Sequence, residues 1–179
     1  EEVDYPLSTE GQSVAYTNYS GQGGVGIGSF FQRLGFSLRY SELNLMISNQ
    51  LSDDSKIIME RNITSRVKKA VPFLYTDNDP YLALIEGNLF WIIDMYTVSD
   101  KYPYAQPADT RRINERSGLP INFNYIRNSV KAVVNAYDGT MDFYVFDETD
   151  PLIQTYAKIF PSLFTDKADM SSSLLDHIR

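Results

Sequence analysis

The chain has 179 residues, the length of about one domain, and its 16 Lys and Arg against 23 Asp and Glu give a formal charge of −7. This acidic balance argues against a nucleic-acid partner, which needs a basic face, and against electrostatic docking on anionic lipid. The sequence holds no Cys, which excludes thiol catalysis, zinc–thiolate sites and iron–sulfur clusters. Its single His, His177, lies three residues from the end and is expected to be exposed rather than part of a catalytic triad.

The first third of the chain is predicted to be mainly helical after an irregular start. Residues 1–25 form a glycine-rich segment that we expect to be irregular. A helix is expected next, because Ser29 is a good N-cap and apolar residues recur at helical spacing at Ile27, Phe30, Phe31, Leu34 and Leu38. Residues 41–50 are expected to form a second helix with Leu43, Met46 and Ile47 facing inward, and residues 56–60 a short strand.

A third helix and two hairpins follow. A helix is expected over residues 62–71, with Asn62 as its cap and Pro72 ending it. Apolar runs over residues 82–85 and 89–97 flank the turn signal Glu86-Gly87-Asn88. Runs over residues 124–137 and 141–147 flank Asp138-Gly139, a pair typical of a tight two-residue hairpin turn. Both hairpins are therefore expected in one antiparallel sheet, with turns at Gly87 and Gly139.

The last part of the chain carries a connector and two helix signals. Residues 105–122 are predicted to be an exposed connector. Asp150-Pro151 predicts a helix with Asp as N-cap and Pro in the first position, and Leu152, Tyr156 and Ile159 are its expected buried stripe. A short helix is expected from Ser171. The predicted fold class is α+β: one antiparallel sheet built from two hairpins, with helices packed on one face, in a single soluble domain over residues 1–179.

Four stretches together resemble one known family. They are YSGQGGVGIGSFFQRLGFSLRYSELNLMIS at 19–48, FWIIDMYTVSDKYPYAQ at 90–106, NYIRNSVKAVVNAYDGT at 124–140 and FYVFDETDPLIQTYAKIFPSLF at 143–164. They resemble the UPF0182 family of uncharacterised bacterial membrane proteins. The resemblance implies an excised piece of the soluble, extracytoplasmic portion of a cell-membrane protein, whose expected partner is the membrane-spanning block of the same polypeptide. It implies no activity and transfers no catalytic residue.

The most suggestive candidate binding residues lie around a proline-constrained loop. Tyr102 and Tyr104 flank Pro103, and tyrosines held in this way are rigid, amphipathic contact residues; Asp100 lies at the start of the same loop. Arg127 and Asn128 offer a forked donor and an amide on an otherwise apolar strand. We expect the loop to pack beside Arg127, and Arg127 either to contribute to binding or to pair with a carboxylate such as Asp100.

Two further patterns are more typical of local turns and loops than of ligand or metal sites. The run from Gly21 to Gly26 satisfies G-x-G-x-x-G, but no buried strand precedes it as a dinucleotide site requires. The helix N-terminus after it has the N–H groups to bind a small anion, with Gly23, Gly24, Gly26 and Gly28 as the loop. Asp77-Asn78-Asp79 lacks the spacing of a calcium loop and is read as a turn, so we expect no metal and no cofactor.

Three functions remain open on the sequence. The first is an extracytoplasmic module that binds, senses or interacts with a partner, which requires no catalytic set. The second is a cell-envelope hydrolase in which carboxylates such as Asp94 and Asp100, or Asp147 and Glu148, act as acid and base. The third is anion or nucleotide binding at the glycine loop.

Overall fold

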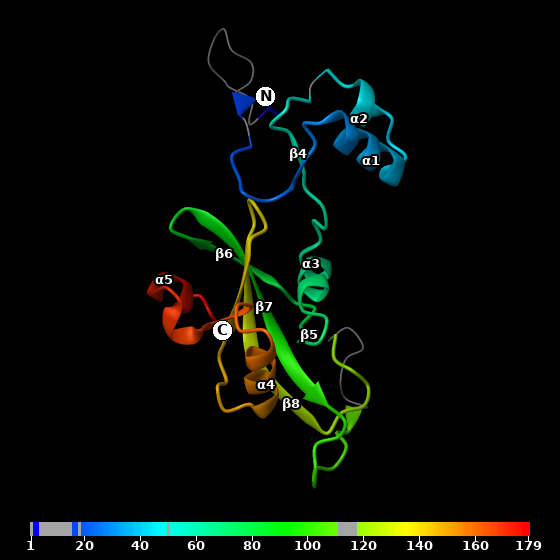
Figure 1. Ribbon diagram of the computed structural model, residues 1–179. Coiled ribbons are helices and arrows are strands. Elements are labelled where there is room, and N and C mark those ends of the chain that lie inside the picture. The colour runs from blue at the N-terminus through cyan, green and yellow to red at the C-terminus, as the bar shows by residue number, and fades with distance from the viewer. Residues whose placement is uncertain (1, 4–15, 18, 50, 111–117) are drawn as a thin grey trace. The chain divides into compact units, whose positions relative to one another are not determined.

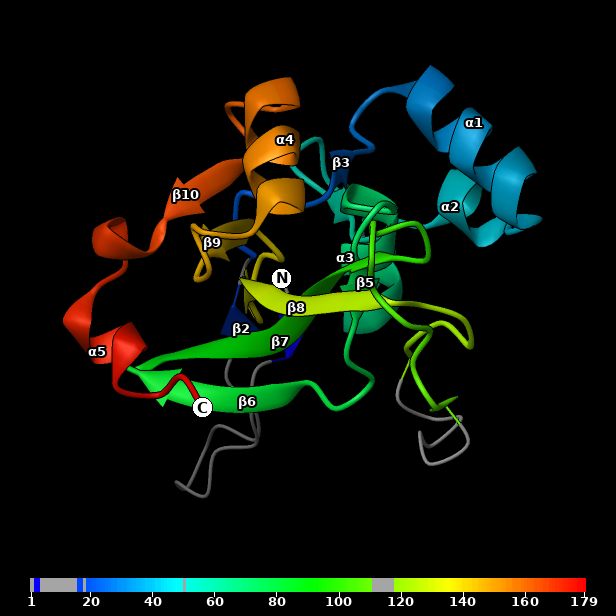
Figure 2. The ribbon, with the colours of Figure 1, turned by 90° about the horizontal axis from the view of Figure 1, so that it is seen from below.

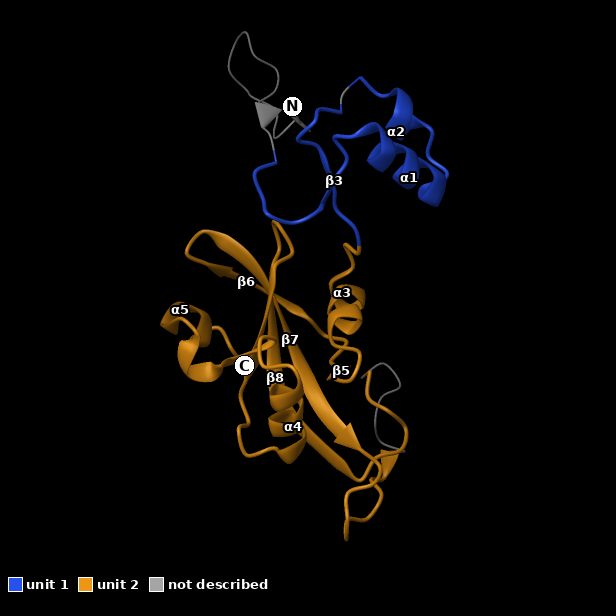
Figure 3. Cartoon of the chain, viewed as in Figure 1, with its two compact units in different colours: residues 1–59 blue, residues 60–179 orange. Residues whose placement is uncertain are grey.

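The computed structural model describes residues 2–3, 16–17, 19–49, 51–110 and 118–179 (Figure 1). The chain forms two compact units, residues 1–59 and residues 60–179 (Figure 3). Most of the predicted irregular segment, and residues 111–117 of the predicted connector, lie outside the described residues. No helix in the described ranges is long and apolar enough to cross a membrane. The single domain over residues 1–179 stays a prediction.

The first unit is built from short strands and a helical pair. Its elements are β1 (Glu2–Val3), β2 (Tyr16–Thr17), β3 (Val25–Gly26), α1 (Phe30–Tyr40), α2 (Asn44–Ile47) and β4 (Lys56–Ile57). Strand β3 pairs with β4 and β1 with β2, both antiparallel. The predicted cap of α1 is confirmed: the Gln32 N–H donates to Ser29 Oγ over 3.3 Å, and the Ser29 N–H donates to Gln32 Oε1 over 3.2 Å.

Several large apolar side chains of this unit lie at its surface, although Ile27 is buried. Phe30, Phe31 and Leu38 of α1 are exposed, and so are Leu43 and Ile47, whose predicted inward orientation is wrong. Two polar side chains of α1, Arg33 and Ser37, are covered and bond to nearby backbone. Arg33 donates to the Ile27 carbonyl over 2.9 Å, and Ser37 Oγ donates to the Glu42 carbonyl over 2.9 Å. These bonds hold that side of α1 against the backbone of the surrounding loops, while Phe30, Phe31 and Leu38 remain exposed.

The second unit is a sheet with helices. Its elements are α3 (Ile63–Ala70), β5 (Tyr75–Thr76), β6 (Tyr81–Ile85), β7 (Asn88–Ser99), β8 (Tyr125–Asn135), β9 (Met141–Val145), α4 (Pro151–Ile159), β10 (Phe164–Asp166), the 3-10 helix η3 (Lys167–Asp169) and α5 (Ser172–Leu175). The strand order is β10-β9-β8-β7-β5, and β6 also pairs with β7. Both predicted hairpins and the α+β class are confirmed. The sheet is antiparallel except at β10, which adds parallel to β9.

The two hairpin turns differ from each other. Glu86 and Gly87, at φ 51° and 81°, join β6 to β7 as a two-residue turn with positive φ at both positions. The predicted two-residue turn at Asp138-Gly139 is wrong, because β8 ends at Asn135 and β9 begins at residue 141. Asn135 widens this turn: its side chain accepts the Tyr137 N–H over 2.8 Å and its carbonyl accepts the Gly139 N–H over 2.8 Å.

Helices cover both faces of the sheet rather than one (Figure 2). One face carries the larger core, in which α3 and α4 pack through Val67, Val71 and Ile153. On the other face Met170 and Leu174, around α5, pack against alternate residues of the same strands. The predicted caps Asn62 and Asp150 begin α3 and α4, and the short helix expected from Ser171 is α5, which Ser171 caps. The buried stripe of α4 is shifted, because Ile153 is buried whereas Ile159 is exposed.

Replacing Gly139 by Val is expected to destabilise the protein by about 1 kcal/mol or more. Gly139 has φ 73°, and a Cβ there would meet the Arg66 guanidinium at 2.5 Å. Gly87→Val is the matched control, because Gly87 has φ 81° but open space around it, so its cost is backbone strain alone. Urea unfolding measures both, and an unchanged midpoint for Gly139→Val contradicts the turn geometry.

Candidate functional site

A bulge in the central strand pair positions the site. Met95 lies opposite Val130, but two residues further along β7 Thr97 lies opposite Arg127, so β8 contains one extra residue between these pairs. The bulge turns two successive β8 side chains, Ser129 and Val130, toward the face on which α4 packs: Ser129 bonds to the α4 cap, and Val130 joins the core around α4. The Ser129 hydroxyl thereby reaches the N-terminus of α4.

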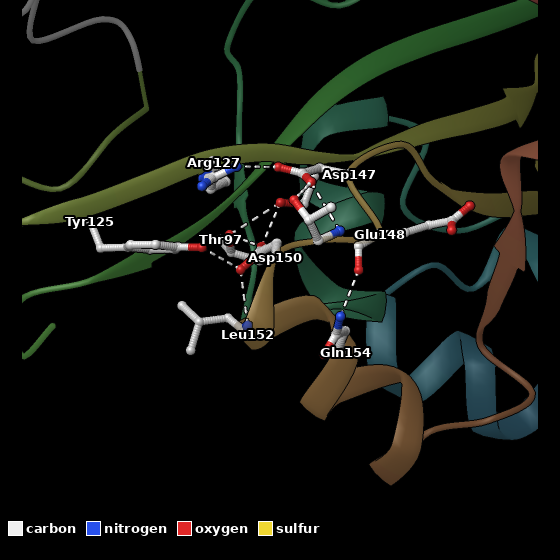
Figure 4. Close-up of polar contacts among 10 residues, drawn as sticks. Thr97, Tyr125, Arg127, Asp147, Glu148, Asp150, Leu152 and Gln154 are labelled. Carbon is white, nitrogen blue, oxygen red and sulfur yellow. Dashed lines mark hydrogen bonds and ion pairs between the residues drawn. The ribbon is translucent and has the colours of Figure 1, made fainter.

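A buried carboxylate stands at the centre of the site. Asp150, the N-cap of α4, has no exposed surface, and Figure 4 shows the donors arranged around it. Its Oδ2 accepts hydrogen bonds from Ser129 Oγ and Thr97 Oγ1, both over 2.5 Å. Its Oδ1 accepts from Tyr125 OH over 2.6 Å and from the Leu152 N–H over 2.9 Å. Three hydroxyl groups and a helix N-terminus thus solvate the charge in place of water.

These hydrogen bonds set the protonation states of Asp150 and Tyr125. Burial raises the pKa of the Asp150 carboxyl, but the hydrogen bonds from Ser129, Thr97 and Tyr125 outweigh burial and hold the pKa below its ordinary value. Burial and the bond to Asp150 raise the pKa of the Tyr125 phenol well above its ordinary value. At neutral pH Asp150 is therefore ionised and Tyr125 keeps its proton.

Tyr125 links the buried Asp150 to residues at the surface. The ring of Tyr102 stacks on the ring of Tyr125 with centroids 4.5 Å apart and planes 18° apart. Asn124 fixes the backbone of Tyr102 from both sides, accepting its N–H over 2.9 Å and donating to its carbonyl over 2.8 Å. The Arg127 guanidinium lies 5.9 Å from the centre of the Tyr125 ring. We call Tyr102, Tyr104, Tyr125 and Arg127 the tyrosine surface.

The other predicted site residues are exposed. Tyr104 is fully exposed at the loop tip, with φ 61°, a conformation that a tyrosine rarely adopts. Asp100 and Asn128 are also exposed. The loop does pack beside the start of β8, as expected, but through Tyr102, which bonds to Asn124 and stacks on Tyr125.

Arg127 pairs with a different carboxylate from the one expected. Its guanidinium donates to Asp147 Oδ2 over 2.8 Å, so the predicted pairing with a carboxylate is confirmed, but the carboxylate is Asp147 and not the suggested Asp100. Asp147 follows β9, the neighbour of β8, and its N–H lies 3.4 Å from the Ser129 carbonyl. The Thr149 hydroxyl and Arg127 lower the pKa of Asp147, although its partial burial opposes them. The Arg127 side chain remains 48% exposed, which leaves the guanidinium accessible.

The glycine loop serves chain packing. A Cβ on Gly28 would lie 2.3 Å from the Asp53 carbonyl oxygen, so only glycine allows this close approach. Gly26 lies in β3, Gly24 has φ 92°, and Gly23 precedes them in the same loop. Ser29 and Gln32 already satisfy N–H groups at the start of α1, which weakens the case for an anion there.

No metal site is apparent in the part of the chain that the structure describes, where no three His, Asp or Glu side chains are grouped suitably. Asp77 Oδ1 accepts the Asp79 N–H over 3.2 Å, which makes Asp77-Asn78-Asp79 the predicted local turn. Sequence reasoning missed Thr97, Ser129 and Tyr125 as partners of Asp150. The available signal was their polarity within apolar strands, because a buried hydroxyl requires a partner.

Comparison with known proteins places the chain in a family. The model of the uncharacterised protein family UPF0182 matches residues 1–179. The chain belongs to the UPF0182 family. It is 48% identical to a UPF0182 protein of Trichodesmium erythraeum over 100% of the chain and 20% of that protein. It is 45% identical to one of Thermobifida fusca over 90% of the chain and 17% of that protein, and 46% identical to one of Moorella thermoacetica over 99% and 18%.

The UPF0182 chain thus spans about a fifth of the length of the curated relatives it matches. No solved structure matches it. The family resemblance seen in the sequence is confirmed, and it assigns no activity to any residue of the site.

Asp150→Ala is expected to destabilise the UPF0182 chain by about 3 kcal/mol or more, because three hydroxyl groups lose a charged acceptor and α4 loses its cap. Asn62→Ala is the matched control: Asn62 caps α3 through the Ser65 N–H but is exposed, so its loss is expected to cost about 1 kcal/mol. Urea unfolding compares the two, and equal losses contradict the central role of Asp150.

The pH dependence of stability follows from the lowered pKa of Asp150. Near and below the unfolded pKa of about 3.9, the unfolded state binds more protons than the folded state, so stability rises with pH. This contribution is complete above the unfolded pKa and is lost as the pH falls through the folded pKa. From about pH 6 to pH 2 the wild type should lose more unfolding free energy than Asp150→Asn. Asp147 titrates in both proteins, so parallel curves contradict the assignment.

Proposed function

We propose that this chain is a binding or interaction module of a larger membrane protein, exposed on the extracytoplasmic side. The observation that carries the proposal is the tyrosine surface. It presents an exposed guanidinium beside a stacked tyrosine pair, and Tyr104, two residues after Tyr102, is fully exposed. Tyrosine and arginine are the residue types that most often dominate protein contact surfaces.

Two members of the tyrosine surface, Tyr102 and Tyr125, are held in place before any partner binds. Tyr125 is held from beneath by Asp150, and Tyr102 is held by Asn124 and by stacking. Side chains that are already ordered lose little conformational entropy on binding, so more of the contact energy appears as affinity. The unusual backbone conformation of Tyr104 agrees with this role, because strained conformations persist most often at functional sites.

The carboxylate hydrolase receives less support. A general acid that works near neutral pH needs a raised pKa, whereas the pKa values of Asp147 and Asp150 are both lowered. Asp94 forms an ion pair with Lys131, and Asp100 is exposed at the end of β7. The anion or nucleotide alternative is weakened because Ser29 and Gln32 already occupy N–H groups at the start of α1.

The extracytoplasmic location is testable with a single introduced cysteine, because residues 1–179 contain none. We expect Tyr104→Cys in the full-length protein, with any cysteine outside these residues replaced, to react with a membrane-impermeant maleimide in intact cells. Met95→Cys is the matched control, since Met95 is fully buried and should stay unlabelled. Labelling of Tyr104→Cys only after the cells are permeabilised contradicts the proposal.

The binding role is testable by photo-crosslinking in cells. Benzoylphenylalanine replaces Tyr102 or Tyr104 in the full-length protein, and Tyr75 on β5, which is as exposed as Tyr102, is the control position. We expect one discrete adduct from positions 102 and 104 and none from position 75. Tyr104→Ala should weaken the adduct from position 102 while changing unfolding free energy by less than about 0.5 kcal/mol. Equal adducts from all three positions contradict a specific surface.

A further inference from the structure

Strand β6 forms an unprotected edge of the sheet. It pairs with β7 on one side, and no other strand of the described residues pairs with its outer side. Edge strands are usually protected from further pairing by a charged residue, a proline or a bulge within the strand. Residues 81–85 read YLALI and contain neither a charge nor a proline, and their register with β7 is continuous. This edge is therefore ready to accept another strand.

A row of leucines runs along the same edge. Leu82 lies opposite Trp91 and Leu84 opposite Leu89, so the leucines share one face of the sheet. Leu82, Leu84 and Leu89 are 47%, 62% and 46% exposed. A strand added to β6 would bring its own side chains against Leu82 and Leu84, and it would remove this apolar surface from water.

The last residues of the chain lie at the start of this strand. Tyr81 OH donates to the His177 carbonyl over 3.2 Å, and the Arg179 N–H donates to Tyr81 OH over 3.3 Å. The Arg179 guanidinium lies 4.4 Å from the centre of the Tyr81 ring. Figure 2 shows this end of the chain beside β6. A polypeptide that continues past Arg179 therefore emerges next to the side chain of Tyr81, on the face of the sheet that carries Ala83 and Ile85.

We propose that β6 accepts an added strand from the stretch of the longer protein that follows Arg179. The relatives are about five times as long as this chain, so a protein of their length has polypeptide outside residues 1–179 to supply it. A tethered segment acts at an effective concentration on the order of millimolar, which favours it over a second copy of the protein. A strand that starts beside Tyr81 and runs toward Ile85 is parallel to β6, as β10 is to β9.

Hydrogen exchange of the backbone amides of residues 81–85 tests the proposal. We expect exchange in the full-length protein to be at least about tenfold slower than in residues 1–179 alone, because paired amides open less often. In the full-length protein, Leu84→Lys should restore the faster exchange. Ile159→Lys is the matched control, since Ile159 is equally exposed on α4 and far along the chain from β6.

Equal exchange in the two proteins overturns the proposal. So does protection that appears only as protein concentration rises, because it identifies a second copy as the added strand. Protection that survives Leu84→Lys also overturns it, since it places the protecting contact elsewhere. Slow exchange that is independent of concentration, and that is lost in Leu84→Lys but not in Ile159→Lys, supports it.

Discussion

The second unit depends on one buried charge, the carboxylate of Asp150. Burying an ionised carboxylate is costly unless hydrogen bonds replace its hydration. Here Thr97 on β7, Ser129 on β8 and the first turn of α4 all donate to it, so the charge is stable only when these elements meet. The same carboxylate holds the phenol of Tyr125 and through it the stacked ring of Tyr102. Core and surface are thereby joined through one acceptor.

The β8 bulge makes this arrangement possible. Side chains alternate between the two faces of a regular strand, so without the extra residue Ser129 would lie on the face opposite Val130 and away from α4. The bulge allows Ser129 to bond to Asp150 while Val130 stays in the core, and it leaves Tyr125 and Arg127 on the side of the site. Bulges often redirect side chains in this way beside functional sites. The position of the tyrosine surface thus follows from a local irregularity in the sheet.

Much of the fold was predictable because its signals are local. Ser29, Asn62 and Asp150 act as helix caps through bonds to N–H groups two or three residues away, and the hairpins follow from apolar runs around turn residues. The partners of Arg127 and Asp150 were not predictable, because they depend on strand register and on the bulge. The surface position of the α1 stripe was missed for a related reason: helical spacing shows that a stripe exists but not what it packs against.

A double-mutant cycle between Tyr125→Phe and Asp150→Ala tests the central claim most directly. Tyr125→Phe removes one hydroxyl from the carboxylate and leaves the stacked ring in place, so the cycle isolates the link between the core and the tyrosine surface. If Asp150 holds Tyr125, the double variant will lose about 1–3 kcal/mol less unfolding free energy than the sum of the two single-variant losses. Additive losses would contradict the account, because they would mean that the buried charge and the tyrosine surface are energetically independent.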